Sequence, residues 1–141
     1  MPESPLAAPT RSARKIIPHF PSNSIHATIR YYGEVLHFNI GEPQFLRPET
    51  SEPKFVSVCA GEHADANIYF FLTSHSVRKL SPGNIMIAMS TDGLEQYYNL
   101  LKEEAKVTFV DEIEDKEWGY RQFEIADEDG NHIQFFRFLD D

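Results

Sequence analysis

Apolar and polar positions follow a strand period and a helix period in turn along the first half of the chain. From Ile25 to Leu36 the apolar residues recur every three or four positions, which predicts a helix with one buried face. Ser24 precedes this stretch and is the expected N-cap, because its hydroxyl can accept a first-turn amide hydrogen bond. The apolar residues between Ile16 and Phe20 predict a short strand that Pro21 ends. Three further strands are predicted at 36–40, 54–60 and 67–72.

The second half repeats this order. Residues 84–89 predict a strand, and Asp92 is the expected N-cap of a helix because Glu95 follows at capping-box spacing. Apolar residues between Leu94 and Ala105 form the stripe of that helix. The segment 127–131 has the turn chemistry of a hairpin. The last three predicted strands are 107–113, 120–126 and 132–139.

The order of strand, helix and three strands therefore occurs twice, with a period of about 65–68 residues. A local match supports a duplication, since aligning Ile68 with Ile133 makes two Phe-Phe pairs coincide. We expect an α+β protein made of two βαβββ modules in tandem. Residues 1–14 have no hydrophobic period and are expected to form a flexible arm, with one domain over 15–141. Its modules should cover about 15–75 and 82–141.

Composition narrows the functional classes. The chain has 141 residues with 13 basic and 22 acidic side chains, a formal charge of −9, which disfavours a nucleic-acid partner. This balance favours a cationic partner, although solubility alone also explains it. A single cysteine excludes an intrachain disulfide. Without a span-length apolar run or a signal-like N-terminal stretch, we expect a cytoplasmic protein with no membrane partner.

Two segments carry a resemblance to a known family. The C-terminal segment follows a family pattern of tryptophan-glycine, a strand, an acidic turn and a final strand. These parts are Trp118-Gly119, residues 120–126, Asp127-Glu128-Asp129-Gly130-Asn131 and the strand that begins at His132. The segment Ile17-Pro18-His19-Phe20-Pro21-Ser22 looks like the first strand of the same family. On these segments the chain resembles the vicinal oxygen chelate superfamily, which includes glyoxalase I, extradiol dioxygenases, fosfomycin-resistance enzymes and bleomycin-resistance proteins. The resemblance implies paired βαβββ modules that form a concave half-barrel sheet around a cavity, completed in a homodimer.

The resemblance also indicates where a metal would bind. In metal-dependent members the ligands are histidines or carboxylates on the first and last strand of each module. The corresponding positions here are Ile17, Tyr69, one of Asn84 to Met86, and Gln134, and none is a histidine or a carboxylate. We therefore expect no family metal site and no cofactor, as in the metal-free branch typified by bleomycin-resistance proteins.

Seven residues form the candidate ligand-binding set. Aromatic rings can stack on a flat ligand, and a cationic ligand gains cation–π attraction from them. The alternative is that these rings belong to the core or to a subunit contact. The set comprises Trp118, Tyr120, Phe38, Phe55, His19, Tyr69 and Gln134.

Other residues leave alternatives open. His19 and His132 could form a non-family metal site or an acid–base pair, or they could lie at a pocket rim and at an exposed turn. The acidic run 111–117 could attract a cationic drug, or it could be a solvated strand edge that blocks edge pairing. Cys59 lies between two apolar residues of a predicted strand and is expected in the core.

The leading functional hypothesis is a homodimeric binding protein of the bleomycin-resistance type. It would sequester a flat ligand, with a cation favoured, in an aromatic crevice and so give antibiotic resistance without chemistry. The alternative is an enzyme on the same scaffold, an isomerase, lyase or cyclase that acts on a natural-product intermediate. In that case His19, Tyr69 and Gln134 are the candidate catalytic residues. A third hypothesis is an accessory protein without a ligand.

Overall fold

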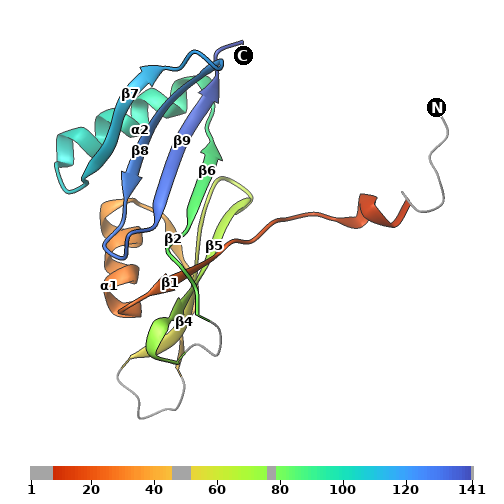
Figure 1. Ribbon diagram of the computed structural model, residues 1–141, viewed down its shortest axis with the longest axis vertical. Coiled ribbons are helices and arrows are strands. Elements are labelled where there is room, and N and C mark those ends of the chain that lie inside the picture. Colours follow the sequence, from red (N-terminus) through yellow and green to blue (C-terminus); the bar gives the residue numbers. More distant parts are fainter. Residues whose placement is uncertain (1–7, 46–51, 76–78, 141) are drawn as a thin grey trace.

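The computed structural model describes residues 8–45, 52–75 and 79–140 as two modules that lie end to end (Figure 1). The first module contains the helix α1 and the second contains α2. The first sheet has the strand order β1-β5-β4-β2, with β3 also paired to β4, and the second has the order β6-β9-β8-β7. The elements are η1 (Ala8–Ser12), β1 (His19–Ser22), α1 (Ile25–Arg30), η2 (Tyr31–Val35), β2 (Asn39–Ile40), β3 (Gln44–Phe45), β4 (Pro53–Ala60), β5 (Ala66–Leu72), η3 (Thr73–His75), β6 (Asn84–Ala88), α2 (Thr91–Glu104), β7 (Phe109–Asp115), β8 (Tyr120–Ala126) and β9 (His132–Phe138).

The predicted α+β class with two βαβββ modules is confirmed, and strand pairing follows the same scheme in both. β1 pairs with β5 in parallel, as β6 pairs with β9, and the other partner of β5 and of β9 is antiparallel. Tyr69 is opposite His19 on one side and Ser57 on the other. Gln134 holds the equivalent place between Met86 and Glu124, which supports the predicted alignment of Tyr69 with Gln134.

Each helix covers one face of its sheet. In the first module, Tyr32 lies in the core with its ring centroid 4.8 Å from that of Phe70. In the second, Leu94 and Leu101 of α2 are fully buried, and Tyr97 packs 5.0 Å from Phe135. Because strand side chains alternate between faces, residues on the other face of each sheet have no helix over them. We call this side of each sheet its open face.

The first strand differs from its prediction. β1 spans His19–Ser22 and contains Pro21, which was expected to end it. β1 is an edge strand with β5 as its neighbour, so the missing N–H of a proline is tolerated there. Directly upstream of β1, the Pro18 carbonyl accepts the Tyr69 N–H of β5 at 3.0 Å. The η1 turn lies farther upstream and away from both modules (Figure 1), and Ile16 between them is 88% exposed. Residues 1–7 of the predicted arm lie outside the described residues.

The first helix has the predicted cap and an unpredicted end. Ser24 accepts a hydrogen bond from the Ala27 N–H at 3.2 Å, as expected of the N-cap. After Arg30 the helix widens into a π-helical turn over Tyr31–Val35, and His37 then takes a left-handed conformation with φ 63°. The predicted strand 36–40 is therefore reduced to Asn39–Ile40.

The second module is closer to expectation. β8 has the predicted bounds, while β7 lies two residues later than predicted and contains register shifts. The cap of α2 is Ser90 rather than Asp92, because the Ser90 hydroxyl accepts the Gly93 N–H at 3.1 Å and the helix begins at Thr91. No described helix is long and apolar enough to cross a membrane.

A buried polar network joins the modules around the β8–β9 turn. Asn131 is fully buried, and its side-chain amide donates to the Pro21 carbonyl at 3.2 Å and accepts from the Gly83 N–H at 2.8 Å. The same amide donates to Asp127 at 2.9 Å, and the Asp127 carboxylate also accepts the Tyr32 hydroxyl at 2.7 Å. Burial raises the pKa of Tyr32 well above its ordinary value, and the charge of Asp127 raises it further. The turn therefore fixes β1 of the first module against the start of the second.

Candidate functional site

An aromatic cluster lies on the open face of the first sheet. The His19 ring stacks on Tyr69 with centroids 5.8 Å apart and an interplanar angle of 17°, and it lies 4.9 Å from Phe71. Phe55 meets Tyr69 edge-on at 4.9 Å and lies 5.2 Å from Phe71. His19 is exposed and the other three rings are only partly buried. We call His19, Phe55, Tyr69 and Phe71 the first-sheet cluster.

Polar and small side chains continue this open face along β4 and β5. The Asn67 amide donates to the Ser57 hydroxyl at 2.9 Å. Cys59 is partly exposed instead of buried in the core, because strand alternation puts it on the same face as Ser57 and Phe55.

A second aromatic group, the second-sheet group, lies on the open face of the other sheet. Tyr120 contacts Phe136 at 4.9 Å and Phe138 at 5.1 Å between ring centroids. Trp118, in the turn before β8, is 58% exposed, and its indole N–H donates to the Gln122 side chain at 3.4 Å. These rings can present flat apolar surface to a ligand.

A polar trio, formed by Glu124, His132 and Gln134, lies beside the second-sheet group. One oxygen of Glu124 is 2.6 Å from Nδ1 of His132, and the other accepts the Gln134 amide at 3.0 Å. The side chain of Glu124 is 15% exposed and that of His132 is 37% exposed. Sequence reasoning missed Glu124. Counting outward from the turn 127–131 identifies it, because a hairpin closed there places Glu124 opposite Gln134.

The predicted set is divided between the two modules. The structure brings His19, Tyr69 and Phe55 together on the first sheet, whereas Trp118, Tyr120 and Gln134 lie on the second. Among the described residues, no ring contact links the two aromatic groups.

Phe38 is a correction, because it belongs to the core. It is 7% exposed and packs edge-on to Tyr32 with centroids 5.7 Å apart. The left-handed turn at His37 and the Phe38 N–H bond to the Tyr32 carbonyl place Phe38 beside the helix rather than on the open face. We do not retain it in the candidate site.

The positions that the resemblance aligns with family metal ligands make contacts with other side chains here. Tyr69 stacks with His19, and Gln134 is bonded to Glu124. Within the described ranges no group of three or more histidine, cysteine, aspartate or glutamate residues could hold a metal ion. His19 and His132 lie on different sheets, in separate contacts.

The acidic run before Trp118 is largely compensated by neighbouring cations. Lys116 lies 2.7 Å from Asp111 and also pairs with Glu114. Arg121 pairs with Asp115 at 2.9 Å. The hydrogen bond from the Tyr98 hydroxyl, followed by that from Lys102, lowers the pKa of the Glu112 carboxyl, and Lys102 lies 3.1 Å from it. The run therefore presents less negative charge than its sequence indicates.

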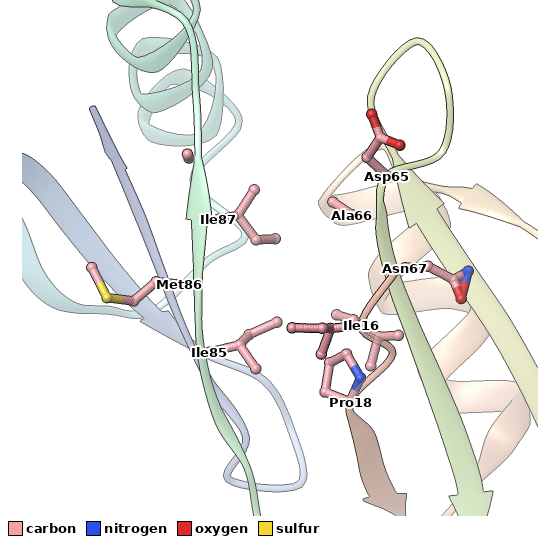
Figure 2. Close-up of a pocket in the computed structure, with 10 residues that line it drawn as sticks. Ile16, Pro18, Asp65, Ala66, Asn67, Ile85, Met86 and Ile87 are labelled. Atoms are coloured by element: carbon pink, nitrogen blue, oxygen red, sulfur yellow. The ribbon is translucent and has the colours of Figure 1, made fainter. Parts of the chain in front are cut away.

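A cavity of about 430 Å³ separates the edge strand β6 from the first module (Figure 2). Ile85 and Ile87 point from β6 toward Ile16 and Pro18, whereas Met86 points away toward the open face. Ala66 and Asn67 of β5 complete the opposite wall. None of the seven predicted ligand-binding residues lines this cavity.

The fold and the open faces define a two-module βαβββ protein with exposed aromatic surface on both sheets. The model of the Glyoxalase/Bleomycin resistance protein/Dioxygenase superfamily matches residues 16–135, so the chain belongs to that superfamily. A search of curated proteins gave no match.

Solved structures of similar fold are distant in sequence. TioX from Micromonospora sp. ML1 superposes with a TM-score of 0.70 at 14% identity, covering 90% of this chain and 100% of TioX. A superfamily member from Sphaerobacter thermophilus DSM 20745 has a TM-score of 0.69 at 22% identity, covering 90% of this chain and 98% of its own. TnmS3, described as an antibiotic binding protein from Streptomyces sp. CB03234, has a TM-score of 0.66 at 20% identity, covering 89% of this chain and 96% of TnmS3. At these low sequence identities the structural similarity shows a shared fold alone.

Proposed function

We propose that this protein is a metal-free small-molecule binding protein of the bleomycin-resistance type, which sequesters a flat ligand. The observation that carries the proposal is the aromatic surface on the open faces, where Tyr69, Phe55 and Tyr120 are partly buried but covered by no helix. A side chain that only packs in the core is normally buried, whereas a ring that stacks on a ligand has to remain accessible to it. The antibiotic-binding description of TnmS3 is consistent with this function.

The binding unit is a homodimer. Each chain carries the first-sheet cluster and the second-sheet group in different modules, without ring contact between them among the described residues. A second copy related by a twofold axis can set its second sheet against the first sheet of its partner and so form two equivalent crevices. We also retain the cytoplasmic location as part of the proposal.

Within each crevice the residues have separate roles. Tyr69, Phe55, Tyr120 and Trp118 provide stacking surface for the ligand. His19 adds a ring with hydrogen-bonding nitrogens at the exposed edge of the first-sheet cluster, and Gln134 adds amide hydrogen bonds. No cofactor takes part.

A fluorescence titration with metal-free bleomycin tests the proposal. Trp118 is the sole tryptophan and is 58% exposed, so it reports a ligand that reaches the second-sheet group. We expect a saturable change for the wild-type protein, at least about tenfold weaker binding for Phe55→Leu, and wild-type binding for the control Leu100→Ala on α2. A titration that stays flat at high micromolar drug excludes bleomycin as the ligand.

The second candidate function is an enzyme on the same scaffold, an isomerase, lyase or cyclase. The polar trio favours it, because a histidine oriented by a carboxylate is a common proton-transfer arrangement. His19, Tyr69 and Gln134 would then position and protonate an intermediate. Mass analysis of the recovered compound separates the two functions, since sequestration returns it unaltered and turnover does not.

A further inference from the structure

The charge pattern of the second sheet distinguishes one carboxylate from the other acids around it. Asp111 is opposite Glu124 in the strand ladder and has Lys116 2.7 Å away. Glu114 shares the same lysine, and Asp115 pairs with Arg121. By contrast, the partners of Glu124 among the described residues are His132 and Gln134, with no lysine or arginine in its ion pairs.

The surroundings of Glu124 strengthen its electrostatic effect. Its side chain is 15% exposed, so little water screens the carboxylate. Each carboxylate oxygen accepts one described hydrogen bond, and an ionised carboxylate has about four acceptor sites in all, so both oxygens can accept more.

Aromatic surface lies within reach of this carboxylate. Gln122, the hydrogen-bond partner of Trp118, is two residues from Glu124 on the same strand and the same face, about 7 Å away along β8. Phe136 is opposite Gln122 in the ladder and contacts Tyr120. An anion next to ring faces matches a flat cation, which gains ion-pair and cation–π attraction together.

We propose that Glu124 is the anionic anchor of the binding site and selects flat aromatic cations over neutral molecules of the same shape. The inference rests on the proposed binding function and assigns its charge selectivity to Glu124, in place of the acidic run 111–117. Gln134 and His132 hold the carboxylate in position, and the rings of the second-sheet group supply the stacking surface.

A matched pair of probes isolates the charge. N-methylacridinium is a permanent cation, and acridine at about pH 8 is a neutral molecule of nearly the same shape. Both are titrated into the full-length protein by calorimetry, using the wild type, Glu124→Gln and the control Glu114→Gln. Glutamine keeps the size of the side chain and removes its charge, and Glu114 is an exposed acid of the run that already pairs with Lys116. Thermal melts verify that both variants fold.

We expect the wild type to bind N-methylacridinium at least about tenfold more tightly than acridine. Glu124→Gln should remove that preference through weaker cation binding, with acridine affinity unchanged within about twofold, and Glu114→Gln should keep it. Equal affinity for both probes, or a preference lost in Glu114→Gln instead, overturns the role of Glu124 and leaves the binding function intact. If neither probe binds and bleomycin does not bind either, the proposed function fails as well.

Discussion

The polar network at the module junction gives a prediction whose size follows from the structure. Asn131→Ala removes a fully buried amide that makes three side-chain hydrogen bonds, to Pro21, Gly83 and Asp127. At about 0.5–1.5 kcal/mol net for each bond, with buried partners left unpaired, the free energy of unfolding should fall by about 2–4 kcal/mol. For a chain of this length that corresponds to a Tm lower by roughly 10 °C.

The assay is urea unfolding followed by circular dichroism, with Asn99→Ala as the matched control. Asn99 is exposed on α2, so its replacement should change the free energy of unfolding by less than about 0.5 kcal/mol. If Asn131→Ala costs less than about 1 kcal/mol, the junction does not depend on this network and the reasoning is refuted.

Three further predictions concern the crevices and the ionisable groups. Tyr69→Ala and Tyr120→Ala should each abolish drug binding. An equal mixture of the two variants, after subunit exchange, should recover about a quarter of the binding sites, because each mixed dimer contains one intact crevice. If no binding is recovered, each site lies within one chain. Burial and, less strongly, the neighbouring charge of Asp127 raise the pKa of Asp129. Asp129→Asn should therefore raise Tm slightly at neutral pH, and this gain should be absent below the ordinary aspartate pKa. A gain in Tm that persists at that low pH would contradict this cause. The pKa of Tyr32 is raised, so its phenol stays neutral in the folded state. The free energy of unfolding should therefore fall as pH rises above about 10, where Tyr32 ionises in the unfolded chain. Urea unfolding at several alkaline pH values measures this slope, and a flat profile would contradict the prediction.

Much of the fold could be predicted because local patterns and tertiary structure agree. Alternation specified β6 and β8, Ser24 was identified as a cap, and the turn 127–131 formed as its residue types require. The predictions of strand and helix boundaries fail where a tertiary contact outweighs the local sequence pattern. Pro21 remains in a strand because β1 is at a sheet edge, and Ser90 takes the cap because its hydroxyl meets a first-turn amide before Asp92 can.

The candidate site was harder to predict, since it depends on strand register and side-chain pairing. His19, Tyr69 and Phe55 belong to the predicted set, and the rings of His19 and Phe55 both contact that of Tyr69. Phe38 could not be placed, because a left-handed residue before it reverses the expected face. The ion pair of Asp111 with Lys116 lies where the register of β7 shifts, and no local pattern predicts that shift.

The most direct test of the binding account is native mass spectrometry of the full-length protein mixed with metal-free bleomycin. We expect a dimer that carries two drug molecules, each released with unaltered mass, because two equivalent crevices sequester the ligand without chemistry. A protein that stays free of drug at concentrations well above micromolar would exclude bleomycin as the ligand. A monomer that carries the drug, or a drug released with an altered mass, would contradict sequestration by a homodimer.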